Sequence, residues 1–173
     1  MKNKIWKWVL YILPAALVVV LDQITKVWAV GALKDQESIV LIKGALEFSY
    51  VENTGMAFGL MKDSQLFFYV ATGIALAALV YFVVKIRFSK RFFPLVLILS
   101  FVSGGAVGNL IDRIVNKYVV DFIYVSLINF PVFNVADICV TLGCITLVVL
   151  ILFVYKDEEL KPLLPFGKKK TNK

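Results

Sequence analysis

The sequence predicts an α-helical integral membrane protein with four transmembrane helices and a small extracytoplasmic β-sheet. The chain has 173 residues, of which 60% are hydrophobic, and its mean hydropathy is +0.84. A soluble domain of this length could not bury so much apolar surface. The excess lies in four segments that are each long enough to cross a bilayer. Between the first two segments, apolar and polar residues alternate with the period of a β-strand. We therefore expect a single membrane domain over residues 1–173.

The four spans are expected at about residues 8–30, 66–84, 92–111 and 135–155. The first span follows three lysines within the first seven residues and so resembles a secretory signal peptide. Its apolar run, however, continues past Asp22 and Lys26, and tryptophans stand at both of its ends, as in an interfacial aromatic belt. We expect this segment to be retained as a membrane helix. Glycines at 104, 105 and 108 are expected to let helices approach closely in the third span.

Two segments outside the spans are expected to face the extracytoplasmic side. Residues 31–65 form a β-rich insertion, with strands predicted near 38–42 and 46–50 and a turn at Lys43-Gly44. Residues 112–134 form a second external loop, which contains the apolar stretch 119–123 around Asp121. Residues 156–173 form a basic cytoplasmic tail.

The distribution of basic residues predicts the orientation. The N-terminus, the loop after the second span and the C-terminal tail contain 3, 4 and 6 of the 19 basic residues. The insertion 31–65 has three lysines against five acidic residues. The positive-inside rule therefore places both termini in the cytoplasm. The net charge of +7 reflects this topology, and no nucleic-acid partner is expected.

The residue types that are missing restrict the chemistry. The chain has no histidine, which excludes Ser-His-Asp and Cys-His catalysis and any histidine metal site. Its two cysteines, Cys139 and Cys144, have neither redox nor zinc spacing and are expected to be packing residues. No metal or cofactor is expected. Acid–base chemistry near neutral pH must then use carboxylates, lysine or tyrosine.

Every unusual polar residue is predicted to lie at the outer membrane face. Asp22 is 14 residues past Trp8, or about 21 Å along a helix, and can pair with Lys26 at i,i+4. Ionisable residues at this depth are costly and usually functional. The others at this face are Asn53, Asn109, Arg113, Asp121, Asn134 and Asp137.

Structural explanations remain open for several of these residues. Asp22 and Lys26 could be an interfacial ion pair, and Arg113 could snorkel to the head groups. Asn134 could cap the fourth span, with Asp137 favourable at the positive helix end. Asp112 is expected to be exposed or salt-bridged.

Two aspartates could form a catalytic pair. Asp121 and Asp137 lie 16 residues apart, across a loop that returns to the same face. Two carboxylates held close cannot both ionise, so one keeps a proton. Such a pair can activate a water molecule to attack an amide carbonyl without metal, histidine or a covalent intermediate.

Taken together, the motifs resemble those of the bacterial lipoprotein signal peptidases (signal peptidase II), a family of four-span membrane aspartyl proteases. The resemblance rests on five blocks in this order: DQITK at 22–26, NTGMAF at 53–58, GGAVGNLIDR at 104–113, VDF at 120–122 and FNVAD at 133–137. It implies that Asp121 and Asp137 are the catalytic dyad. The residues that it implies shape or support the site are Asp22, Lys26, Asn53, Gly55, Asn109, Arg113, Asn134 and Ala136.

The resemblance also implies a substrate and a location. Members remove signal peptides from prolipoproteins after a diacylglyceryl group has been attached to the cysteine that follows the cut. The partners implied are these prolipoproteins, membrane lipid and globomycin-type inhibitors, with the active site at the extracytoplasmic face of the bacterial cytoplasmic membrane. We also expect a monomer.

Two other function classes would also use polar residues at a membrane face. A small ion- or proton-coupled transporter would use intramembrane Asp and Lys residues as a relay, but the inner halves of the spans carry no charges and no inverted repeat is visible. A non-catalytic lipid-binding or assembly protein would need no second carboxylate. Asp121 is therefore the residue that discriminates between the classes.

Overall fold

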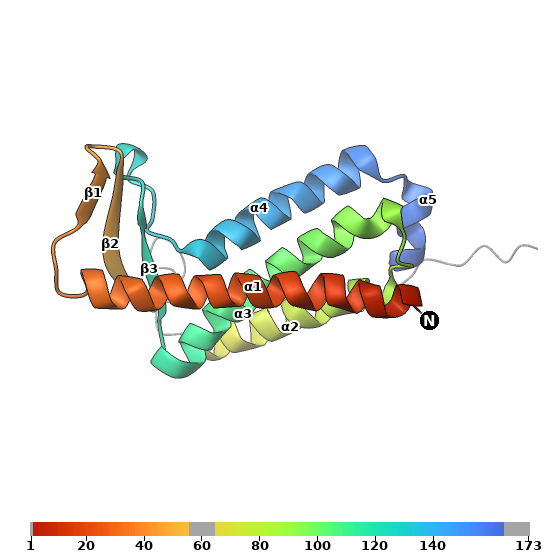
Figure 1. The fold of residues 1–173 in the computed structure, drawn as a ribbon, viewed down its shortest axis with the longest axis horizontal. Coiled ribbons are helices and arrows are strands. Elements are labelled where there is room, and N and C mark those ends of the chain that lie inside the picture. The colour runs from red at the N-terminus through yellow and green to blue at the C-terminus, as the bar shows by residue number, and fades with distance from the viewer. Residues whose placement is uncertain (1, 56–64, 165–173) are drawn as a thin grey trace, which may run out of the picture.

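The structure is a computed structural model that describes residues 2–55 and 65–164. Four of its helices are long and apolar enough to cross a membrane, as predicted, and they run alongside one another (Figure 1). They are α1 (Lys2–Leu33), α2 (Gln65–Lys85), α3 (Phe93–Asn116) and α4 (Val135–Val149), the last of which continues as a π-helical turn, η4 (Leu150–Val154). A short 3-10 turn, η2 (Lys90–Phe92), leads into α3.

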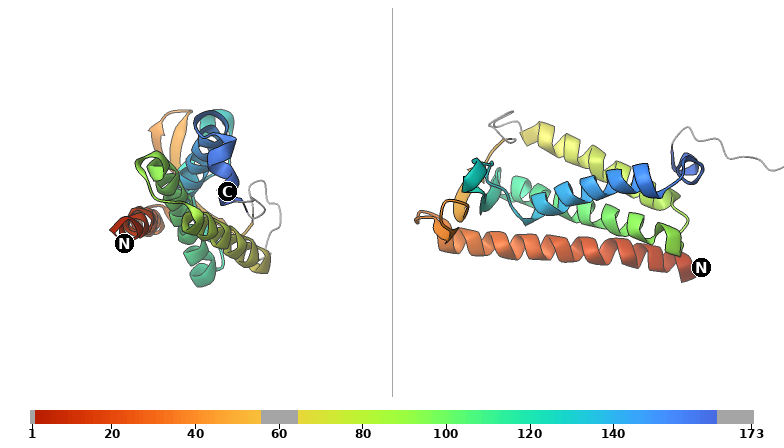
Figure 2. Two further views of the ribbon diagram at one scale, coloured as in Figure 1. Left: turned by 90° about the vertical axis from the view of Figure 1, so that its right-hand side faces the viewer. Right: turned by 90° about the horizontal axis from the view of Figure 1, so that it is seen from above.

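Helix α3 occupies the middle of the bundle and packs against each of the other three helices (Figure 2). Its glycines permit this close packing. A Cβ added at Gly104 would lie 2.7 Å from the carbonyl oxygen of Ala15 in α1, and one at Gly105 would lie 2.6 Å from that of Ala136 in α4. Small residues are used in this way where membrane helices approach with their backbones nearly in contact.

A three-stranded antiparallel sheet lies at one end of the bundle (Figure 1). Its order is β1-β2-β3, with β1 (Ile39–Ile42), β2 (Leu46–Asn53) and β3 (Val119–Tyr124). The first two strands and their turn at Gly44, where φ is +71°, confirm the predicted hairpin. The apolar stretch of the second external loop adds β3 to this sheet, so that two distant loops share one structure.

The end of α1 supports the sheet. Trp28 contacts the rings of Phe48 on β2 and Phe122 on β3 edge to face, with centroids 5.3 and 6.0 Å apart. Leu33 is buried in the same cluster. Helix α1 therefore continues three residues beyond the expected end of the first span, because its last turn packs under the sheet.

The other end of the bundle is closed by the start of the C-terminal segment. Here α5 (Asp157–Leu160) and the 3-10 turn η5 (Lys161–Leu163) fold against the helix ends within the segment expected to be a charged tail. Leu163 is buried beside Leu95 of α3. At the same end, the Lys7 ammonium of α1 donates a 2.7 Å hydrogen bond to the Val83 carbonyl, which closes the last turn of α2.

Candidate active site

The first aspartate of the expected dyad, Asp121, lies on β3, the most buried strand of the sheet. Asp121 is 1% exposed, although it has a titratable carboxyl group. It stands between the buried residues Val120 and Phe122. Its Oδ2 accepts a 2.8 Å hydrogen bond from the Asn53 amide, which the pairing of β2 with β3 places beside it. Its Oδ1 accepts a 2.7 Å hydrogen bond from the Asn134 amide.

The second aspartate lies in the first turn of α4. Asn134 is the N-cap of this helix, as expected, and its Oδ1 accepts a 2.9 Å hydrogen bond from the Asp137 amide. In return, Asp137 Oδ2 accepts from the backbone N–H of Asn134 at 3.2 Å. This reciprocal capping box fixes the Asp137 side chain at the helix start. The Asn109 amide of α3 donates to its other oxygen at 2.8 Å.

A backbone bridge brings the two aspartates into one site. Ile123 at the end of β3 and Phe133 before α4 exchange hydrogen bonds of 2.8 and 3.0 Å between their backbone groups. The bridge closes the loop 125–132, which includes the short η3 turn (Ser126–Ile128). The chain therefore leaves the site and returns to it at one point.

Two asparagines connect the aspartates. The Asn134 amide that binds Asp121 also lies 3.1 Å from Asn109 Oδ1, and Asn109 in turn binds Asp137. Burial, together with the nearby charge of Asp137, raises the pKa of Asp121 to about 7, against the opposing effect of the hydrogen bonds from Asn53 and Asn134. Near neutral pH the Asp121 carboxyl therefore readily holds a proton.

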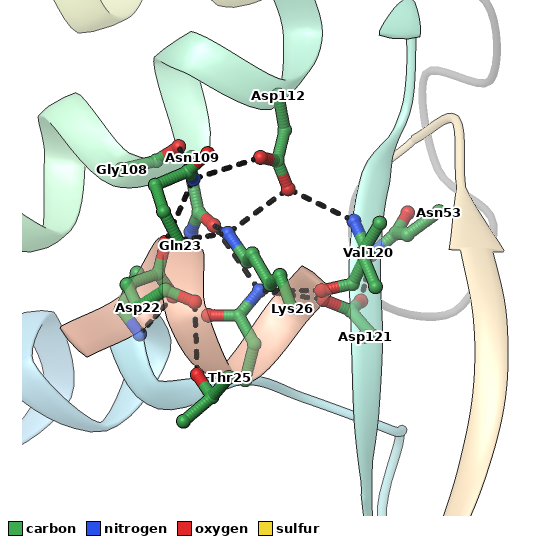
Figure 3. Close-up of polar contacts among 12 residues, drawn as sticks. Asp22, Gln23, Thr25, Lys26, Asn53, Gly108, Asn109, Asp112, Val120 and Asp121 are labelled. Atoms are coloured by element: carbon green, nitrogen blue, oxygen red, sulfur yellow. Dashed lines mark hydrogen bonds and ion pairs between the residues drawn. The ribbon is translucent and has the colours of Figure 1, made fainter. Parts of the chain in front are cut away.

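A buried ion triad of Lys26, Asp22 and Asp112 lies near Asp121 (Figure 3). The Lys26 ammonium is 2.8 Å from Asp22 Oδ2 and 3.0 Å from Asp112 Oδ2, and these side chains are 3%, 0% and 4% exposed respectively. Its third hydrogen bond, of 2.8 Å, goes to Asn109 Oδ1. The predicted i,i+4 pair is thus present. All three N–H bonds of the ammonium are used, and the triad orients the asparagine that binds Asp137.

Each acid of the triad also holds a neighbouring backbone. Asp22 Oδ1 accepts from the Ala136 amide at 3.0 Å, which attaches α4 to α1. Asp112 Oδ2 accepts from the Val120 amide at 3.1 Å, which attaches β3 to α3 next to Asp121. A Cβ added at Gly108 would lie 2.5 Å from Asp22 Oδ2, so only glycine leaves room for this carboxylate.

The environment of Asp112 differs in part from the one expected. Of the two expectations for this residue, the salt bridge is right and the exposed position is wrong. Because Asp112 and Arg113 are both buried and bonded, they do not end the helix, and α3 continues to Asn116, five residues past the expected end of the third span. Gln23, which donates to Asp112 Oδ1 at 2.9 Å, was also missed. The signal was spacing: Asp112 is i+3 from Asn109, and Gln23 is i−3 from Lys26.

Arg113 points into the protein. Its Nη2 donates to the Gly55 carbonyl at 3.0 Å, and its guanidinium lies 3.7 Å from the centre of the Phe68 ring. The side chain is buried, so the alternative of snorkelling to the head groups is wrong. Gly55 in turn donates its N–H to Asn53 Oδ1 at 3.1 Å. Within the described residues, the buried Nη1 of Arg113 has no hydrogen-bond partner.

The ten expected site residues therefore form one connected cluster, drawn from α1, β2, the turn after β2, α3, β3 and α4. They are Asp22, Lys26, Asn53, Gly55, Asn109, Arg113, Asp121, Asn134, Ala136 and Asp137. In residues 2–55 and 65–164, no group of three His, Cys, Asp or Glu side chains could hold a metal ion. The positive charge that balances the carboxylates here comes from Lys26 and Arg113.

The fold and the cluster define a class: a multi-pass membrane protein with a hydrogen-bonded aspartate pair at the sheet end of a four-helix bundle. Residues 14–153 match the family model for signal peptidase (SPase) II. The chain belongs to the signal peptidase II family and is therefore a membrane protease, which argues against the transporter alternative.

Similar proteins cover most of the chain. The lipoprotein signal peptidase of Clostridium tetani is 43% identical over 143 residues, which is 81% of this chain and 88% of that protein. That of Chlorobium phaeobacteroides (strain BS1) is 45% identical over 152 residues, 81% of this chain and 94% of that protein. A bacterial membrane enzyme solved at 1.9 Å resolution superposes with a TM-score of 0.73 at 35% identity, over 83% of this chain and 92% of its own.

Proposed function

We propose that this protein is an aspartic endopeptidase that removes signal peptides from diacylglyceryl-modified prolipoproteins, cutting just before the lipidated cysteine. The observation that carries the proposal is the pair Asp121 and Asp137. Asp121 is buried and Asp137 is partly buried, both oxygens of each side chain accept a hydrogen bond, and two asparagines connect them. The similar proteins of known activity are lipoprotein signal peptidases, and they supply the substrate class.

In the proposed mechanism the pair shares one proton, held by Asp121, while Asp137 is ionised. Asp137 accepts a proton from a water molecule as that water attacks the scissile carbonyl, and Asp121 donates its proton to the carbonyl oxygen. The tetrahedral intermediate then collapses and the C–N bond breaks. Asp137 gives its proton to the leaving nitrogen, and a hydroxyl proton of the intermediate returns to Asp121. The products are the signal peptide with a free carboxylate and the lipidated cysteine with a free amine.

The residues around the pair have separate proposed roles. Asn53, Asn109 and Asn134 use amide N–H groups to hold the two carboxylates in place. Arg113 Nη1 is a buried donor without a partner among the described residues, and we assign it to a carbonyl oxygen of the bound substrate. Globomycin-type cyclic peptides are proposed to compete with the substrate for the hydrogen-bond donors of Arg113 and the three asparagines.

The proposed orientation places the pair at the extracytoplasmic face and both termini in the cytoplasm. The sheet, whose strand β3 contains Asp121, lies at one end of the bundle, and the start of α1 and α5 lie at the other (Figure 1). At that other end α1 begins, with three lysines among the first seven residues, and α2 is followed by four more basic residues, as the positive-inside rule requires of the cytoplasmic side. A diacylglyceryl group would hold the substrate cysteine at the depth of the pair, where water has access from outside.

The test is cleavage of a lipidated precursor by Asp121→Asn and Asp137→Asn variants in proteoliposomes. We expect each to lose activity by at least about 10²-fold, as for a lost general acid or base, while the inserted protein stays folded. Glu158→Gln, which changes an exposed carboxylate at the other end, is the control and should keep full activity. Full activity in either dyad variant would refute the aspartic mechanism.

Two further measurements test the substrate and the orientation. An otherwise identical unlipidated precursor should be cleaved much more slowly, and equal turnover would indicate a general membrane protease. A cysteine at Ser49 on β2 should react with an impermeant thiol reagent added outside intact cells. Labelling only after permeabilisation would reverse the orientation.

A further inference from the structure

An apolar cavity of about 450 Å³ lies at the end of the bundle opposite the aspartate pair. Helices α2, α3 and α4 form its sides, and α5 with η5 forms its floor. The apolar residues that line it include Phe82, Leu95, Leu99, Leu147, Ile151 and Leu163. It shares no residue with the site described above, so it needs an explanation of its own.

The walls of the cavity suit a hydrocarbon chain. Leu95 and Leu99 at its back are buried, whereas Ile151 on the π-turn η4 is 41% exposed. The cavity is therefore accessible from the side at which α4 faces the bilayer. Apolar cavities of this kind do not retain water and bind apolar molecules instead. In a membrane, the apolar molecules at hand are the acyl chains of lipids.

The charges at the mouth select the head group. Asp157 and Lys161 both line the cavity. The two segments around it, 85–91 and 156–161, hold six basic and three acidic residues. One of those acids, Glu159, is already bound to Arg91 at 3.0 Å. The remaining excess of positive charge favours an anionic head group, as basic pockets at the cytoplasmic ends of membrane helices do.

The same charges disfavour the other apolar candidate, a signal peptide. Such peptides begin with a positively charged region followed by an apolar segment. A signal peptide with its apolar segment in this cavity would bring its basic region to a rim that is already basic. Loss of the Lys161 charge should therefore weaken binding of an anionic lipid and strengthen binding of a signal peptide.

We propose that this cavity binds one acyl chain of an anionic phospholipid, with the lipid phosphate beside Lys161. The bound lipid attaches α5 and η5 to the ends of α2, α3 and α4 in the leaflet opposite the aspartate pair. This site is separate from the proposed proteolysis. The catalytically impaired Asp121→Asn variant should bind lipid like the natural protein, so failure of one proposal leaves the other testable.

The test is retention of phosphatidylglycerol by the full-length protein in an uncharged detergent, measured by native mass spectrometry against phosphatidylcholine with the same acyl chains. We expect tighter binding of phosphatidylglycerol. Lys161→Gln should weaken it about fivefold, as expected for one lysine near an anionic lipid. Lys43→Gln removes the same charge in the turn between β1 and β2 and should have no effect. Ile151→Trp should fill the mouth and abolish retention, whereas Ile145→Trp, on α4 outside the cavity, should not.

Photolabelling identifies the occupant directly. A phosphatidylglycerol with a diazirine on its acyl chain should label the segment 147–164 in the natural protein and not in Ile151→Trp. Three outcomes would overturn the proposal: equal affinity for the two phospholipids, undiminished retention in Ile151→Trp, or displacement of the lipid by a signal peptide that crosslinks to the same segment.

Discussion

Replacement of Lys26 by methionine tests whether the buried ion triad holds the active site together. Methionine has nearly the length of lysine but no charge and no donor. The change would leave Asp22 and Asp112 buried without the ammonium that now lies 2.8 and 3.0 Å from them. Removing one partner of a buried ion pair costs about 3–5 kcal/mol, because an uncompensated charge remains. For a chain of this length, that corresponds to a fall in Tm of roughly 6–20 °C.

The chain provides a matched control for this experiment. Lys34 lies 3.0 Å from Glu52, the same separation as Lys26 from Asp112, but its side chain is 42% exposed. Exposed ion pairs contribute little, because water and salt screen them. Lys34→Met should therefore leave Tm almost unchanged, so that burial rather than distance distinguishes the two variants.

The assay is thermal unfolding of the purified variants in one detergent, followed by a thiol-reactive dye or by light scattering. A second variant, Lys26→Met with Asp112→Asn, removes one of the two uncompensated carboxylates and should recover part of the lost stability. A Tm for Lys26→Met within about 2 °C of the natural protein would refute the structural role. So would a double variant no more stable than the single one.

Three other changes test the site. Gly108→Ala should lower Tm and proteolysis together, because its Cβ would lie 2.5 Å from the Asp22 carboxylate, whereas Gly73→Ala on α2 meets nothing within 4 Å and should lower neither. Asn134→Ala should cost about 0.5–2 kcal/mol through the lost N-cap, and it should also lower kcat because Asp121 loses a hydrogen bond. The pKa of Asp121 rises on folding from 3.8 to about 7, so the stability conferred by its proton is present at low pH and lost as pH rises through about 7. Between pH 4 and pH 8 the free energy of unfolding of the natural protein should fall by up to about 4 kcal/mol relative to that of Asp121→Asn. Its kcat/KM should fall above about pH 7. A stability difference between the two proteins that does not change with pH would contradict this assignment.

The membrane helices could be predicted well because the hydropathy and length of a span depend only on the residues within it. The exact ends of these helices could not be predicted in this way. Leu33 extends α1 because a sheet built from later residues covers it, and Asp112 extends α3 because a lysine from α1 neutralises it. In both cases the decisive partner is distant in sequence, so no local pattern contains it.

The sequence was enough to predict which residues gather at the site, but not which residue bonds to which. The expectation that polar residues converge at one membrane face rested on depth along each span, which a helix translates directly into distance. The partner of each side chain was not accessible in this way. Arg113 could equally have snorkelled outward, and only the path of the chain after β2, which brings the Gly55 carbonyl within 3.0 Å, turns it inward.

The bridge between Ile123 and Phe133 has a consequence for the chain between the two aspartates. Because the backbone is already closed there, the separation of Asp121 and Asp137 should not depend on the number of residues in the loop 125–132. Residues inserted or removed after Tyr124, which still belongs to β3, should leave both carboxylates in place. The loop is therefore a suitable place for an epitope tag or a fluorophore in an active protein.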